Sequence, residues 1–137
     1  MRRRLLALVV SGSLAAGALM SACGSDGGTD VKLSVQGERG RTVAEEQGCT
    51  SCHTSDGSKG VGPSWKGMAG SKIELNDGST VVADDEYLRA AILDGRSQVV
   101  KGYANIMPVY KGELSDSQVE DLIAFFNDLA APTPEIS

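Results

Sequence analysis

The sequence predicts an all-α domain, and three observations support this prediction. Three segments carry helix patterns, whereas the pattern of paired strands is limited to a small hairpin near residues 73–83, around Asp77-Gly78. The chain has 137 residues, which suggests one domain. It contains only two Phe, three Tyr and one Trp. Because a small domain with few aromatic residues buries too little apolar surface to be stable by itself, we expect a large apolar group to complete its core.

The first two helices are predicted over residues 38–47 and 85–94. The first is polar and only weakly amphipathic, and Gly48 ends it. The second can be capped at its start by Asp84 or by the aspartate that follows. Gly95 suits its C-terminal end, because glycine tolerates the left-handed conformation in which helices often end.

The third helix, over residues 114–130, has the clearest pattern. Ser115 and Gln118 are spaced as a capping box, in which each side chain accepts a hydrogen bond from the backbone amide of the other residue. Apolar residues then recur at the helical spacing i, i+3, i+4, i+7. This apolar stripe consists of Val119, Leu122, Ile123, Phe126, Leu129 and Ala130.

Residues 1–22 have the architecture of an export signal. Arg2, Arg3 and Arg4 precede a run without charges that reaches Cys23, an order typical of secretory signals. The stretch "MSAC" resembles the lipobox of bacterial lipoproteins, in which the cysteine is lipidated after cleavage. The alternative is an uncleaved anchor, because the uncharged run is just long enough to span a membrane. In either case the rest of the chain is expected to be exported and held at a membrane.

The remainder of the chain divides by composition into three parts. Residues 23–36 are rich in Gly and polar residues, and they are predicted to form a flexible tether of roughly 20 Å root-mean-square length. The folded domain is predicted over residues 37–131, and residues 132–137 form a tail. Without residues 1–22, ten Lys and Arg stand against eighteen Asp and Glu. This acidic balance disfavours nucleic acid and anionic lipid as partners, and it could steer a basic partner toward the domain.

The stretch "GCTSCH" contains Cys49, Cys52 and His53, which is the only histidine of the chain. A structural zinc site needs about four Cys or His ligands, and this run offers three. A thioredoxin-like redox pair needs a βαβ context, whereas here a predicted helix precedes the motif and a Gly-rich loop follows it. Covalent haem attachment needs two thiols for the two vinyl groups and an adjacent His to ligate the iron. In an exported chain the motif therefore favours haem.

The iron of such a haem needs a sixth ligand or an open face. A second histidine is absent from the sequence, so the candidates beyond the signal are Met68 and Met107. Met68 follows His53 too closely for the chain to reach the opposite face of a porphyrin easily. Met107 lies in a loop between the second and third helices, and Pro108 stiffens the backbone just after it. We therefore predict His53 and Met107 as the iron ligands, and ordinary packing for Met68.

These motifs resemble class I cytochrome c over about residues 37–131. The resemblance covers a helix, the C-x-x-C-H motif, a G-x-G-P loop, a second helix, an M-P pair and an amphipathic last helix. The segments that carry it are "GERGRTVAEEQGCTSCH", "GVGPSW", "DEYLRAAILDG", "NIMPVY" and "VEDLIAFFNDL". The chain is similar to the cytochrome c domain of haem–copper oxidase subunit II. A copper-binding domain is not recognised in the sequence, so we expect a free-standing relative.

The resemblance implies a role for each residue around the iron. Cys49 and Cys52 would form thioethers with one haem c, His53 would be the proximal ligand and Met107 the distal one. The carbonyl of Pro63 would accept a hydrogen bond from the other nitrogen of His53, which fixes the tautomer of the ring and strengthens it as a ligand.

The resemblance also implies roles for residues farther from the iron. Trp65 would contact the haem with its apolar ring, and Asn105 would reach a propionate. Gly40 and Phe125 match the positions where the first and last helices cross, where only glycine permits a close approach. Ala44 departs from the family pattern, because an aromatic residue is usual there.

The function implied by the resemblance is that of a monohaem electron carrier rather than an enzyme. We expect it to be lipid-anchored through Cys23, at the outer face of the cytoplasmic membrane or in the periplasm. The expected partners are a quinol-oxidising complex and a terminal oxidase or reductase. The alternative is a haem-based sensor of small ligands, or a peroxidase-like enzyme, in which the distal side of the iron is open.

Overall fold

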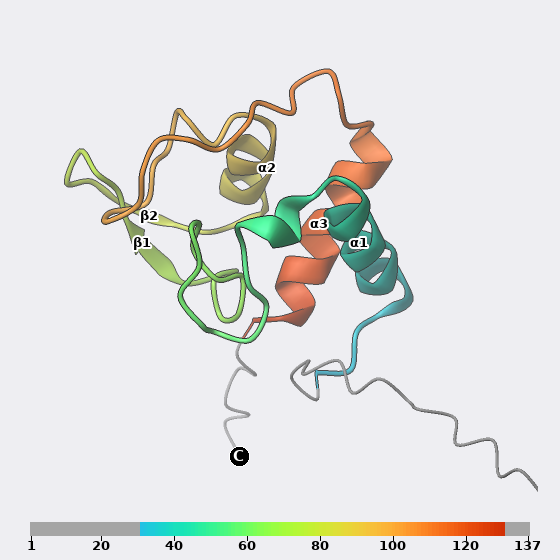
Figure 1. The fold of residues 1–137 in the computed structure, drawn as a ribbon. Helices are drawn as coiled ribbons and strands as arrows, with labels where there is room; N and C mark the ends of the chain where they lie inside the picture. The colour runs from blue at the N-terminus through green and yellow to red at the C-terminus, as the bar shows by residue number, and fades with distance from the viewer. Residues whose placement is uncertain (1–30, 131–137) are drawn as a thin grey trace, which may run out of the picture.

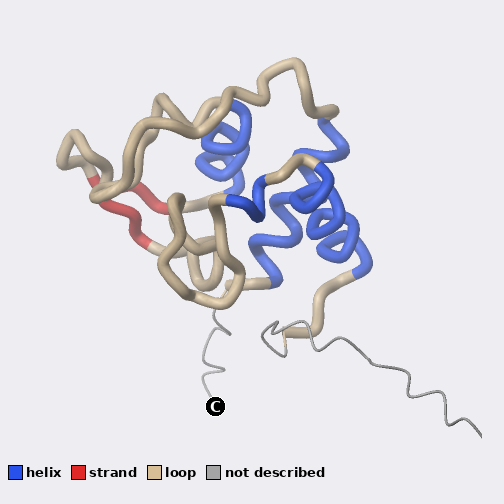
Figure 2. The backbone as a smooth tube through the Cα atoms, in the orientation of Figure 1, coloured by secondary structure: helices blue, strands red, loops and turns tan. Residues whose placement is uncertain are grey.

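The computed structural model describes residues 31–130, which form three α-helices, one short 3-10 helix and a two-stranded sheet (Figure 1). The elements in chain order are α1 (Val35–Glu46), η1 (Cys49–Ser51), β1 (Lys72–Glu74), β2 (Thr80–Val82), α2 (Asp85–Leu93) and α3 (Asp116–Asp128). Figure 2 shows that long loops connect these elements. Nowhere in this part of the chain is a helix long and apolar enough to cross a membrane. The predicted signal at 1–22, Cys23 and the tail at 132–137 lie outside the described residues.

The predicted all-α fold with a small hairpin is confirmed. Helices α2 and α3 lie within the predicted ranges 85–94 and 114–130. Strands β1 and β2 pair antiparallel, with Ile73 opposite Val81, as expected for the hairpin near 73–83. The 3-10 turn η1 was not predicted, because three residues are too few to carry a periodic pattern.

The folded domain begins earlier than the predicted boundary at residue 37. Val31 and Leu33 pack against the hydrophobic core. The side chain of Ser34 accepts a hydrogen bond from the amide of Gly37 and so caps α1. The backbone amide and the hydroxyl of Ser34 both donate to the carboxylate of Asp128, at 2.7 and 2.8 Å. Residues 31–36, which the composition assigned to the tether, are therefore part of the domain.

Helices α1 and α3 cross in close contact (Figure 1). A Cβ atom at Gly40 would lie 1.9 Å from the carbonyl oxygen of Asp121 and 2.8 Å from the Cβ of Phe125. The predicted pairing of Gly40 with Phe125 is thereby confirmed. Ala44, the departure from the family pattern, is fully buried. On the exposed side of the crossing, the guanidinium of Arg39 donates two hydrogen bonds to the carboxylate of Asp121.

The core forms where α2 and α3 turn their apolar faces toward each other. Helix α2 is capped by Asp84, whose carboxylate accepts a hydrogen bond from the amide of Tyr87 at 2.8 Å. The α2 side chains that point inward are Tyr87, Leu88 and Ile92. The predicted stripe of α3 is buried from Val119 to Leu129, and Phe125 is buried beside it. The same inward face of α2 therefore also forms one wall of the site, because Leu88 and Ile92 line the pocket described below.

Replacing Ser115 with alanine should lower the free energy of unfolding by about 1 kcal/mol, the usual cost of losing an N-cap. The predicted capping box is present: the Ser115 hydroxyl accepts from the amide of Gln118, and the Gln118 side chain accepts from the amide of Ser115 at 2.9 Å. The change is measured by denaturant titration. Ser117→Ala is the matched control, because the Ser117 hydroxyl meets only that of Ser115, and it should cost less than about 0.5 kcal/mol. Equal losses in the two variants would show that the cap does not stabilise α3.

Candidate functional site

The C-x-x-C-H motif lies in a tight turn just after α1. Gly48 adopts a left-handed conformation, with φ of 71°, which ends the helix and reverses the direction of the chain. The 3-10 turn η1 follows, and the amide of His53 donates to the carbonyl of Cys49 at 3.0 Å. Cys49 and Cys52 both carry free thiols; Cys49 is half-buried and Cys52 is exposed. One turn of backbone therefore holds the two thiols and the imidazole together.

The ring of His53 is fixed from two sides. Its Nδ1 lies 2.7 Å from the carbonyl oxygen of Pro63, as predicted. Since a carbonyl can only accept, Nδ1 carries the proton and Nε2 is left with a free lone pair. A Cβ at Gly62 would lie 2.6 Å from the Cε1 of this ring, so only glycine lets the loop pass so closely. Trp65, which is 4% exposed, lies nearly parallel to the imidazole, with 5.2 Å between ring centres.

Burial sets the protonation of the two most important groups in the turn. It lowers the pKa of His53, because the charged imidazolium loses its hydration, while the hydrogen bond to Pro63 acts in the opposite direction. The ring is therefore neutral at neutral pH, the form that binds a metal. Burial raises the pKa of the Cys49 thiol, and a hydrogen bond with Tyr110 partly offsets this effect. Cys49 is thus held as a thiol rather than a thiolate.

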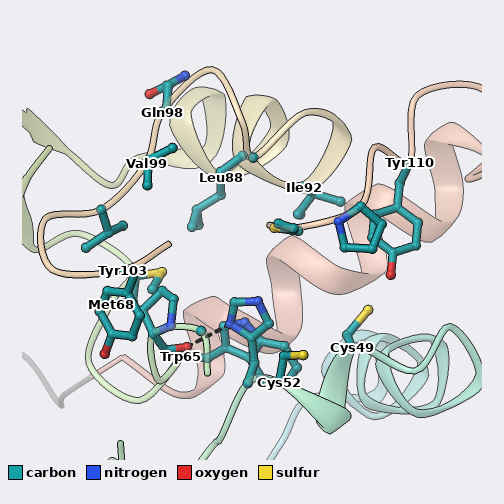
Figure 3. A pocket seen from close by; sticks show the side chains of 18 of the residues that line it. Cys49, Cys52, Trp65, Met68, Leu88, Ile92, Gln98, Val99, Tyr103 and Tyr110 are labelled. Atoms are coloured by element: carbon teal, nitrogen blue, oxygen red, sulfur yellow. Dashed lines mark hydrogen bonds between the residues drawn. The ribbon is translucent and has the colours of Figure 1, made fainter. Parts of the chain in front are cut away.

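An apolar pocket lies between this turn, α2 and the loop that contains Met107 (Figure 3). Cys49, Cys52, His53 and Met107 all line it. None of the Asp, Glu, Lys or Arg residues within residues 31–130 is among the lining residues. In Figure 3 the two cysteines lie at one end of the pocket, and Tyr103 and Met68 lie at the other. The apolar lining includes Pro63, Trp65, Leu88, Ile92, Val99 and Phe126.

Met107 packs against Gly95, just beyond the end of α2. A Cβ at Gly95 would lie 2.5 Å from the sulfur of Met107, so the absence of a side chain at Gly95 makes room for this thioether. Gly95 does not have a positive φ, so its role is this close approach rather than the left-handed helix end that the sequence suggested. Met68 also lines the pocket, but it belongs to the partly buried residues that pack against the core.

The structure brings six of the seven predicted haem-binding residues to the pocket and leaves Asn105 outside it. Asn105 is exposed and does not line the pocket, and its amide donates to the carbonyl of Arg96 at 3.5 Å. Nothing in this position supports the predicted propionate contact. Tyr103 was not predicted, although it lines the pocket at the end far from the cysteines. Its position in the same loop as Met107 was the available signal.

Comparison with known families identifies the fold. The model of the family described as "Cytochrome c" matches residues 37–130. The chain belongs to the cytochrome c family. Its three helices and small two-stranded sheet are the class I cytochrome c fold. The family assignment also makes this cytochrome c an electron carrier that binds one haem c covalently.

Among the solved structures to which this cytochrome c is similar is cytochrome cH from Methylobacterium extorquens. The two sequences are 24% identical, the TM-score is 0.49, and the match covers 66% of this chain and 96% of that chain. No curated protein matches the sequence.

The residues of this cytochrome c fit a covalently bound haem. The two free thiols lie at one end of a pocket whose lining is otherwise largely apolar. Gly62 and Gly95 lack the Cβ atoms that would crowd His53 and Met107. A neutral imidazole with its Nδ1 already bonded to Pro63 has the donor atom that haem iron requires.

Proposed function

We propose that this cytochrome c is a membrane-anchored carrier of single electrons in which His53 and Met107 are the two axial ligands. The observation that carries the proposal is that both side chains line one apolar pocket together with the two thiols of the C-x-x-C-H motif. Cys49 and Cys52 would form the thioethers. A haem held in this way supplies one-electron Fe(II)/Fe(III) chemistry without a bond to substrate.

The chain's own residues account for the properties that a carrier needs. Pro63 holds the imidazole in one orientation and strengthens it as a ligand. The thioether of Met107 is a soft, neutral ligand, which favours the reduced metal and raises the reduction potential. The apolar lining acts in the same direction, because it penalises the additional positive charge of the oxidised state. Trp65, Phe125 and Phe126 pack against one another behind the imidazole and make that side of the pocket rigid.

The proposal is tested on the exported wild-type protein. We expect a low-spin spectrum with a sulfur-to-iron charge-transfer band in the oxidised form, little binding of CO at neutral pH, and no free thiol at Cys49 or Cys52 for an alkylating reagent to modify. A five-coordinate spectrum with rapid CO binding would instead favour the sensor or peroxidase-like alternative. A colourless protein with alkylatable Cys49 and Cys52 would refute both.

Anchoring and partners rest on the sequence of the N-terminus and on the resemblance. We propose that Cys23 is lipidated, and that the domain shuttles electrons between a quinol-oxidising complex and a terminal oxidase or reductase at the outer membrane face. A tethered carrier reacts at a raised effective concentration with complexes in the same membrane.

Replacing Cys23 with serine is expected to move the cytochrome from the membrane fraction to the soluble fraction without changing its visible spectrum. A second experiment uses membranes that contain the wild-type protein. When these membranes are supplied with a quinol, oxidation of the cytochrome haem should stop if the terminal oxidase is inhibited. If the variant stays in the membrane, the lipid anchor is wrong. If the haem stays reduced or oxidised regardless of quinol and inhibitor, the proposed partners are wrong.

A further inference from the structure

The loop that carries Met107 is fastened to the C-terminal end of α2 by backbone contacts. The amides of Tyr110 and Lys111 both donate to the carbonyl of Leu93, at 3.0 and 3.1 Å. Asp94 and Val109 form an isolated antiparallel bridge. These contacts fix the part of the loop that follows Met107. They leave open what holds Met107 itself.

Met107 is held by the two residues that follow this bridge on the α2 side. The Nε of Arg96 donates to the carbonyl oxygen of Met107 at 2.9 Å. The sulfur of Met107 lies 2.5 Å from the place where a Cβ of Gly95 would stand. Gly95 and Arg96 therefore determine the positions of the backbone and of the side chain of the same residue.

The Arg96 side chain has no other role that the structure shows. It is exposed, and it makes no ion pair with any residue among 31–130. By contrast, Arg89 within α2 pairs with Glu120 of α3. A guanidinium donating to a carbonyl makes a charge-assisted hydrogen bond, which is stronger than a neutral one. An exposed arginine whose one side-chain bond goes to Met107 acts on that residue and not on the rest of the fold.

We propose that Gly95 and Arg96 are positioning residues for the distal ligand: Arg96 keeps the Met107 backbone in place, and Gly95 leaves the space that its sulfur occupies. This inference rests on the proposed function, in which Met107 ligates the iron. Loss of the hydrogen bond from Arg96 lets Met107 move relative to Val109, Tyr110 and Lys111, which stay bonded to the end of α2. The sulfur should then leave the iron more often. The fraction of molecules without the sulfur ligand should rise about tenfold, the change expected from losing one charge-assisted hydrogen bond.

The test compares Arg96→Leu with the matched control Arg89→Leu in the haem-loaded, full-length protein. Each variant removes one guanidinium from the region of α2. In Arg96→Leu the rate of CO binding to the reduced protein should rise about tenfold, and the sulfur-to-iron band should weaken. In Arg89→Leu both should stay at the wild-type values, whatever happens to the midpoint of denaturation. Arg96→Lys, which keeps a charged donor, should recover part of the effect.

Gly95→Ala tests the second half of the inference through the side chain. A methyl group there would meet the Met107 sulfur at 2.5 Å and the carbonyl oxygen of Ala91 at 3.0 Å. The backbone tolerates alanine because its φ is not positive, so the flexible thioether is the group that moves. We expect a shifted and weaker sulfur-to-iron band.

The outcomes separate this inference from the proposed function. A wild-type protein without the sulfur-to-iron band refutes Met107 ligation, and the inference falls with it. If the wild-type protein has the band, and neither Arg96→Leu nor Gly95→Ala changes the band or the rate of CO binding, the inference alone is refuted. Equal increases of the CO rate in Arg96→Leu and Arg89→Leu would show a general loosening of the fold and would also overturn it.

Discussion

Replacing Met107 with alanine is expected to abolish the sulfur-to-iron charge-transfer band and to lower the reduction potential. Alanine has no donor atom, and water or another weak ligand stabilises the oxidised metal better than a thioether does. The potential should fall by on the order of 100 mV, a part of the roughly 0.8 V range over which axial ligands set haem potentials. The reduced protein should also bind CO readily. A spectroelectrochemical titration of purified wild type and variant measures the shift.

Met68→Ala is the matched control for this prediction. Both methionines line the same pocket, and both are partly buried, so both replacements remove similar apolar volume. Met68→Ala should lower the free energy of unfolding by about 2 kcal/mol or more through the cavity it leaves, while the sulfur-to-iron band remains. If the band vanished in Met68→Ala and survived in Met107→Ala, the ligand assignment would be reversed.

The elements with strong local signals were predicted well from the sequence. The capping box of Ser115 and Gln118 and the apolar stripe behind it fixed α3, because both signals depend only on residues close in the chain. The start of α1 was missed because its cap lies in a segment of tether-like composition. What holds Ser34 in the domain is the carboxylate of Asp128, a contact between residues 94 positions apart that no local pattern reveals.

The same distinction between local signals and long-range contacts applies to the residues of the site. The C-x-x-C-H motif and its bond to Pro63 were predicted, because a short motif places those atoms in one turn. The surroundings of Met107 were not predicted. Gly95 was interpreted as a helix terminator and Asn105 as a propionate contact, whereas the fold puts Gly95 against the Met107 sulfur and turns Asn105 toward Arg96. These contacts arise from how the loop returns to α2, which depends on the tertiary structure and not on spacing.

Replacing Gly40 with alanine is expected to destabilise the protein more than any other single methyl addition in α1. The new Cβ would lie 1.9 Å from the carbonyl oxygen and 2.5 Å from the carbonyl carbon of Asp121. Both are backbone atoms, so no rotation of a side chain can relieve the overlap, and α1 and α3 must move apart. The expected loss is about 3 kcal/mol, the upper end of the usual cost of overpacking, even though alanine favours a helix by up to about 1 kcal/mol over glycine.

Gly37→Ala separates this backbone clash from a general intolerance of α1 to alanine. Its Cβ would lie 2.0 Å from a carboxylate oxygen of Asp128, which is the end of a side chain and can rotate away. The rotation sacrifices the hydrogen bonds from Ser34, and the gain in helix propensity offsets part of that loss, so we expect a change within about 1 kcal/mol. Guanidinium titrations of the haem-loaded proteins measure both values. If Gly40→Ala lowered the free energy of unfolding no more than Gly37→Ala does, α1 and α3 would have space for a methyl group where they cross. The close approach at Gly40 would then be wrong.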